Sequence, residues 1–146
     1  FYRERFSAVG WKENILFDGV PALLERLREA GKKISIASSK PTVFVERILR
    51  LFEIDCYFDA VSGATLDGSI GTKAQVVAQA LEILHVADRD TAVLVGDRMH
   101  DVEGARENGV DCIGVTFGFG GSEELQKAGA AHIVRTMDEL QDLLLR

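Results

Sequence analysis

Short apolar segments alternate with amphipathic segments along most of this chain, and this alternation limits the fold more than any other feature. The segment Val20 to Ala30 shows the helical half of the pattern. Its apolar residues recur on one face, Pro21 lies in the first turn, and Gly31 follows as a stop. Strand and helix signals that alternate favour a parallel sheet with helices on its faces. The sequence therefore predicts an α/β fold.

The remaining elements can be placed by the same periodicities. The predicted strands are KISIAS ending near Ser38, residues 58–62, VLVG at 93–96, CIGVTF at 112–117 and HIV at 132–134. The predicted helices are 42–52 after Pro41, 74–84 after Lys73, 101–109, 122–129 and a closing helix capped by Thr136 with Glu139. Asp67-Gly68 marks a turn.

Composition excludes several classes of protein. A length of 146 residues is typical of a single domain. The composition, with 47% hydrophobic and 27% charged residues, is typical of a globular protein. A net charge of -6 without a basic cluster argues against a nucleic-acid partner. No apolar run approaches the roughly 20 residues that cross a bilayer, and no secretion signal is recognisable. We therefore expect no membrane partner and a cytoplasmic location.

The two cysteines, Cys56 and Cys112, stand apart without a CxxC spacing. The lack of this motif argues against a zinc site, and two isolated cysteines provide no disulfide framework. We expect both side chains to be buried thiols.

The run from Val93 to Gly109, VLVGDRMHDVEGARENG, has the most chemical content. An apolar strand ends at Gly96, which permits a sharp turn, and Asp97 and Asp101 follow four residues apart, where we expect their carboxylates to face one another. Carboxylate oxygens are ligands that Mg2+ prefers. The alternative is structural, with Asp101 as a helix N-cap and Asp97 as a turn residue.

Three segments are expected to meet at one edge of the sheet, since parallel strands deliver their C-terminal loops to the same side. They carry Ser38 and Ser39, then Lys73, then Asp97 and Asp101. Hydroxyl donors, a cation and a metal-binding acid pair suit a phosphoryl group, whose transfer depends on positioning and charge neutralisation. Taken singly, the serines could cap the helix that follows Pro41, and Lys73 could be a surface lysine.

Two further features are interpreted as structural. His100 lies between the two acids, but a lone loop histidine is usually exposed, so no catalytic role is assigned to it. The glycines between residues 118 and 121 lack the GxxxxGK[ST] pattern and are expected to form a turn.

Taken in order, SIASSKP, TKAQVV and VLVGDRMHDVEGARENG resemble the haloacid dehalogenase superfamily, in its phosphoglycolate phosphatase-like branch with a small helical cap. The resemblance runs from about Leu16 to Arg146 and implies a Rossmann-like core and a Mg2+-dependent phosphatase acting on a small phosphorylated metabolite. It implies that Ser38 binds phosphate and that Lys73 offsets its charge. It makes Asp97 the direct Mg2+ ligand and has Asp101 orient metal-bound water or Lys73.

One departure from the family is large, because its nucleophile is the first aspartate of a DxDxT motif and this chain contains none. Residues 1–17 resemble the last helix of the cap and a linker, and residues 18–146 resemble the core domain. The strand that carries DxDxT lies centrally in the family, so its loss would leave two strands without partners and would favour a homodimer. The chain is then either a segment of a longer enzyme or a protein without its own nucleophile.

The substrate is a second point of departure. GTKAQVV replaces the KPxP pattern common among phosphoglycolate phosphatases, which moves the resemblance toward nucleotidase-like or general phosphatases. The alternative function is a non-catalytic remnant that binds a phosphorylated ligand or a partner polypeptide. A receiver-like signalling domain fits poorly, because there the acid pair precedes the hydroxyl and the lysine, whereas here the acid pair comes last.

Overall fold

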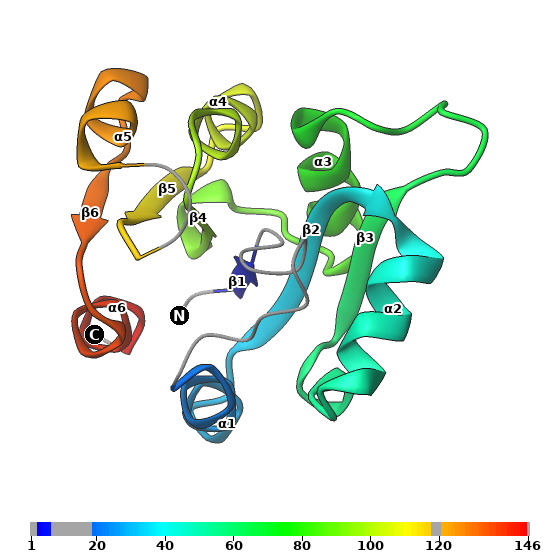
Figure 1. The fold of residues 1–146 in the computed structure, drawn as a ribbon, viewed down its shortest axis with the longest axis horizontal. Helices are drawn as coiled ribbons and strands as arrows, with labels where there is room; N and C mark the ends of the chain where they lie inside the picture. Colours follow the sequence, from blue (N-terminus) through cyan, green and yellow to red (C-terminus); the bar gives the residue numbers. More distant parts are fainter. Residues whose placement is uncertain (1–2, 7–18, 118–120, 146) are drawn as a thin grey trace.

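The computed structural model describes residues 3–6, 19–117 and 121–145, with residues 3–6 described by their backbone. These residues form a six-stranded sheet of order β3-β2-β1-β4-β5-β6, in which every neighbouring pair is parallel. Helices cover both faces of the sheet, with α1 and α6 on one side and α3, α4 and α5 on the other (Figure 1). The predicted α/β fold with a parallel, helix-flanked sheet is confirmed.

The strands are β1 Arg3–Phe6, β2 Lys33–Pro41, β3 Ala60–Ala64, β4 Ala92–Gly96, β5 Asp111–Val115 and β6 His132–Val134. The helices are α1 Val20–Glu29, α2 Thr42–Leu51, α3 Lys73–Ile83, α4 Met99–Glu107, α5 Ser122–Ala128 and α6 Met137–Leu144. Short 3-10 turns at Asp55–Tyr57 and Arg89–Thr91 precede β3 and β4.

The elements predicted after residue 19 are all present, with shifts at some of their ends. Strand β2 extends past Ser38 because Pro41 still pairs with Ala64 of β3 beyond an irregularity in register. Helix α4 begins at Met99, two residues before the predicted start at Asp101. At α6, Thr136 accepts the Glu139 amide as expected, while the Glu139 carboxylate accepts from the Arg135 amide and the Thr136 hydroxyl.

The N-terminal segment differs from expectation. Residues 3–6 are a strand, not part of a helix, and they lie between β2 and β4. The expected gap with two unpartnered strands is therefore wrong, because buried backbone groups need partners and β1 supplies them to both neighbours. The assignment of residues 1–17 to a cap and linker stays a prediction, and residues 1–2 and 7–18 lie outside the described part. A homodimer stays a prediction too, without support from a central gap.

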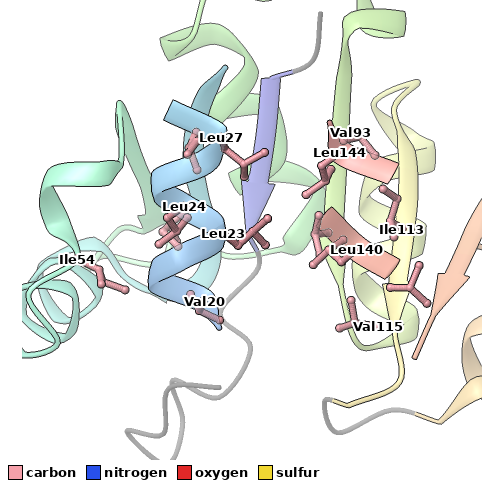
Figure 2. Packing of buried hydrophobic residues seen from close by; sticks show 14 of the residues in the cluster. Val20, Leu23, Leu24, Leu27, Ile54, Val93, Ile113, Val115, Leu140 and Leu144 are labelled. Atoms are coloured by element: carbon pink, nitrogen blue, oxygen red, sulfur yellow. The ribbon is translucent and has the colours of Figure 1, made fainter. Parts of the chain in front are cut away.

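Alternate residues of each strand face opposite sides of the sheet, and both sides are apolar. Val93 and Val95 of β4 belong to a cluster with α1 and α6, whereas Leu94 packs with α3 and α4. Figure 2 shows the first cluster, in which Leu140 and Leu144 of α6 lie beside the strands. Such two-sided burial explains why the strands are continuous apolar runs. No helix in the described ranges is long and apolar enough to cross a membrane.

The two cysteines have different environments. Cys112 is buried in β5, as expected, and burial raises the pKa of its thiol to about 12. Cys56 is exposed in the turn before β3, so the expectation of a buried thiol is wrong there. The 3-10 turn that contains it, Asp55–Tyr57, has no buried residue.

Candidate active site

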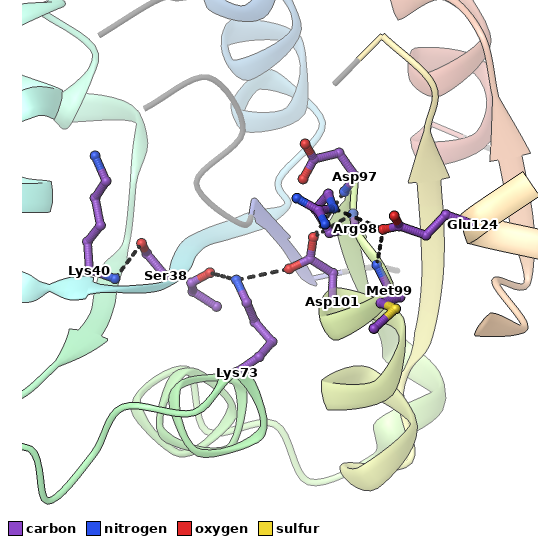
Figure 3. Close-up of polar contacts among 9 residues, drawn as sticks. Ser38, Lys40, Lys73, Asp97, Arg98, Met99, Asp101 and Glu124 are labelled. Carbon is purple, nitrogen blue, oxygen red and sulfur yellow. Dashed lines mark hydrogen bonds and ion pairs between the residues drawn. The ribbon is translucent and has the colours of Figure 1, made fainter. Parts of the chain in front are cut away.

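Four of the five polar residues predicted to converge lie together at the carboxyl edge of the sheet (Figure 3), and the fifth, Ser39, is exposed. Ser38 lies near the end of β2, Lys73 is the first residue of α3, Asp97 follows β4, and Asp101 lies in the first turn of α4. Ser38, Asp97 and Asp101 are 1%, 5% and 3% exposed. Buried polar groups need partners, so their hydrogen bonds define the site.

Lys73 joins two of the three segments. Its Nζ donates to the Ala37 carbonyl oxygen at 2.9 Å, next to Ser38 in β2, and lies 3.0 Å from Oδ1 of Asp101 in α4. Its side chain is only 9% exposed. The interpretation of Lys73 as an ordinary surface lysine is therefore wrong, and the ammonium group lies at the centre of the site.

Asp101 uses both carboxylate oxygens in contacts with the protein. Oδ2 accepts from the backbone amides of Asp97 at 3.0 Å and Arg98 at 3.1 Å, and Oδ1 pairs with Lys73. The alternative interpretation of Asp101 as the N-cap is wrong, because the N-cap of α4 is Arg98 and Asp101 is the third helical residue, from which its carboxylate stabilises the turn before the helix. This arrangement favours a positioning role for Asp101 over direct metal ligation.

The contact between the two acids runs through the backbone, because Oδ2 of Asp101 accepts the Asp97 amide (Figure 3), and the expectation that the two carboxylates face one another stays a prediction. The Asp101 side chain turns back onto the Asp97 amide and so fixes the backbone from which the Asp97 side chain projects. Gly96 makes this possible, because a Cβ at that position would overlap with the Asp101 side chain. Only glycine lets the carboxylate approach this closely.

Ser38 does not cap α2. Its Oγ accepts a hydrogen bond from the Lys40 amide at 3.1 Å, and the N-cap of α2 is Pro41, which has no side-chain cap. A hydroxyl can accept this bond and still donate its own hydrogen to a ligand. Ser39 is exposed, whereas its neighbour Ser38 is buried.

Helix α5 contributes a residue that sequence reasoning missed. Oε2 of Glu124 accepts from Nε of Arg98 and from the Met99 amide, each at 2.9 Å. These bonds, first from Arg98 and then from Met99, lower the pKa of Glu124. Glu124 lies 26 residues from Arg98 in a segment read only as a helix, and no sequence signal connects the two.

Of the residues interpreted as structural, His100 is exposed on α4. Gly121 precedes α5, while residues 118–120 lie outside the described part. The site as described therefore consists of residues from β2, α3, the turn after β4, α4 and α5.

The donor set fits a hard cation. Among the five charged side chains around the turn, three are carboxylates, Asp97, Asp101 and Glu124, and two are cations, Lys73 and Arg98. Lys73 pairs with Asp101 and Arg98 pairs with Glu124. The Asp97 carboxylate is buried at the same turn. Carboxylate oxygens are the ligands that a hard cation prefers, although no cluster of three or more His, Cys, Asp or Glu side chains arranged for a metal occurs in the described residues.

A parallel α/β sheet with a hydroxyl, an ammonium group and carboxylates at its carboxyl edge defines a class of phosphate-handling domains. A family model described as haloacid dehalogenase-like hydrolase matches residues 1–115. The chain belongs to this family, as the sequence motifs predicted.

Relatives extend this result. A 5'-nucleotidase from Pseudomonas aeruginosa is 41% identical over 143 residues, which cover 98% of this chain and 64% of the relative. Tyrosine-protein kinase PtkA of Mycobacterium tuberculosis is also 41% identical, over 145 residues that cover 98% of this chain and 50% of the relative. The crystal structure of a predicted phosphatase from Clostridium acetobutylicum has a TM-score of 0.86 at 46% identity, covering 88% of this chain and 59% of that one. This chain thus spans about half to two thirds of the length of these proteins.

Proposed function

We propose that this chain carries the phosphate-binding and metal-binding part of a Mg2+-dependent phosphomonoesterase. The observation that carries the proposal is the position of the Lys73 ammonium group, bonded to the Ala37 carbonyl and paired with Asp101. One cation thereby joins the hydroxyl-bearing strand to the acid-bearing helix. Phosphoryl transfer needs little else from a protein than such positioning and charge neutralisation.

Ser38 and Lys73 would bind the phosphoryl oxygens. The Ser38 hydroxyl, held by the Lys40 amide, donates to one oxygen, and the Lys73 ammonium group offsets negative charge on the phosphoryl group. Asp101 keeps Lys73 charged and in place, because its Oδ1 lies 3.0 Å from Nζ. These residues act before any bond breaks, by binding and orienting the substrate.

Asp97 would hold Mg2+, and Asp101 would position it through the Asp97 amide. When bound, Mg2+ supplies charge neutralisation and polarisation of the phosphoryl oxygens. The chain contains no DxDxT sequence, so the nucleophile is assigned to a segment outside these 146 residues, whose strand would take the central position that β1 occupies here. The match to only 64% of the P. aeruginosa relative supports this assignment.

The substrate is proposed as a small phosphate monoester. The TKAQVV segment departs from the phosphoglycolate phosphatase pattern, and a 5'-nucleotidase stands among the relatives, so a nucleoside monophosphate is favoured over phosphoglycolate. Comparing the kcat/KM of a fused enzyme for a nucleoside 5'-monophosphate and for phosphoglycolate tests the choice.

The activity is tested with p-nitrophenyl phosphate. We expect the chain alone to be inactive, and we expect a fusion with an N-terminal DxDxT segment from a relative to turn over only with Mg2+. In the fusion, Asp97→Asn should abolish turnover at all Mg2+ concentrations. His100→Ala should retain Mg2+-dependent turnover. A correctly folded fusion without Mg2+-dependent turnover would contradict the proposal.

The absence of DxDxT favours a second candidate, a domain that binds a phosphorylated ligand without turnover. Calorimetry of the chain with Mg2+ and inorganic phosphate separates the two. Binding of both together, with an inactive fusion, supports the binding domain. Absence of any binding contradicts both candidates.

A further inference from the structure

The turn that carries Asp97 is held by two carboxylates from opposite sides. From α4, the Asp101 carboxylate accepts hydrogen bonds from the amides of residues 97 and 98. From α5, the Glu124 carboxylate accepts a hydrogen bond from the Met99 amide. Three successive backbone amides are thus bonded to carboxylates (Figure 3). Such bonds are stronger than those between neutral groups, so they restrict the backbone on which Asp97 is displayed.

Glu124 also forms an ion pair with the cationic side chain of the turn, that of Arg98. The Arg98 side chain is next in sequence to Asp97, and its Nε donates to Glu124 at 2.9 Å. This ion pair directs the guanidinium to α5, although Arg98 is the neighbour of Asp97 in the turn.

We propose that Glu124 is a positioning residue, which fixes the 97–99 turn and directs the Arg98 guanidinium to itself instead of to Asp97. If Glu124 lost its charge, Arg98 would be free to pair with the Asp97 carboxylate and compete with a divalent cation there. This inference rests on the proposed function for the cation at Asp97. It adds α5, which lies outside the three motif segments, to the site.

The test compares Glu124→Gln with Glu123→Gln in the same helix. Glu123 is 82% exposed at its side chain and pairs only with Lys127 among the ion pairs of the described residues, so it is a matched control. Mg2+ titration of the chain by calorimetry should show about tenfold weaker binding in Glu124→Gln and unchanged binding in Glu123→Gln. Equal affinities in the two variants would overturn the proposal.

The double variant Arg98→Gln/Glu124→Gln separates charge control from simple folding. Removal of the competing guanidinium should return the Mg2+ affinity to within about threefold of the wild type, whereas a merely structural defect would persist or worsen. A double variant as weak as Glu124→Gln would overturn the competition between Arg98 and the cation.

Hydrogen exchange at the Met99 amide provides a readout without metal. We expect about tenfold faster exchange at this amide in Glu124→Gln and no change in Glu123→Gln. If the wild-type chain binds no Mg2+, the metal site of the proposed function fails, and Met99 exchange still decides whether Glu124 fixes the turn. Unchanged exchange would overturn that part of the inference.

Discussion

At the scale of single residues, the two aspartates of the VLVGDRMHD run are not equivalent. The Asp101 carboxylate pairs with Lys73 and accepts two backbone amides, whereas Asp97 contributes its backbone amide to this set of bonds and carries a buried carboxylate. The spacing in the sequence could not distinguish them, because both are acids at the end of one strand. Their different hydrogen bonds predict different defects on substitution.

For Asp97→Asn we expect Mg2+ binding to weaken by at least tenfold with little loss of stability, since the amide removes the ligand charge. For Asp101→Asn we expect a loss of about 3 kcal/mol in the free energy of unfolding, because the buried Lys73 ammonium group loses its ion pair. Calorimetry and urea denaturation measure the two effects. Identical profiles for the two variants would contradict the division of roles.

Asp67, in the turn before α3, is expected to titrate abnormally. Hydrogen bonds from the Ser69 amide, then from the Thr65 and Ser69 hydroxyls, lower the pKa of its carboxyl from 3.8 to about 2. Because the folded pKa is depressed, the contribution to stability is present above about pH 4 and is lost as the pH falls toward 2. Asp67→Asn should therefore lower the urea midpoint at pH 6, and the difference from wild type should shrink as the pH falls from about 4 through 2. A constant difference across this range would refute the assignment.

At the scale of elements, close packing between α3 and α4 holds Lys73 in the site. Gly104 of α4 lies against the Lys73 side chain, and a Cβ at this glycine would come within 2.6 Å of Cγ of Lys73. Contacts that short require one of the helices or the lysine to move. The glycine inside α4 is thus a packing requirement, although glycine is unfavourable in a helix interior.

Gly104→Ala should therefore displace Lys73 and lower phosphate binding by the chain several-fold, even though alanine favours helix. The control is Gly71→Ala, at a loop position before α3 where a Cβ would meet nothing within 4 Å. Calorimetry with inorganic phosphate and Mg2+ measures the effect. Stronger or unchanged binding in Gly104→Ala would show that the lysine does not depend on this contact.

At the scale of the molecule, two apolar clusters lie on opposite faces of one sheet. Leu24 of α1 is fully buried in one cluster, and Leu94 of β4 is fully buried in the other. Neighbouring residues of β4 contribute to both clusters, so neither face can lose its packing without affecting the strand that the other face uses.

Leu24→Ala and Leu94→Ala should each lower the free energy of unfolding by about 2 to 5 kcal/mol, since each removes buried methyl groups and leaves a cavity. Urea denaturation followed by far-ultraviolet circular dichroism should show one transition for both variants, with an unchanged slope. A second transition in either variant would indicate that the two faces unfold independently.

The sequence by itself determined the α/β class, the order of elements after residue 19, and the residues Ser38, Lys73, Asp97 and Asp101. Hydrophobic periodicity and the residues that end each strand are local in the sequence, so they predict the elements directly. The carboxyl ends of parallel strands meet at one edge of the sheet whatever side chains they carry, so the sequence also predicts which residues lie there. Only the tertiary structure decided that Arg3–Phe6 lies between β2 and β4 and that the Asp101 carboxylate accepts the Asp97 amide. It also decided that Glu124 reaches the 97–99 turn. These features depend on which backbone and side-chain groups must be paired once they are buried, and pairing between distant segments leaves no periodic trace in the chain.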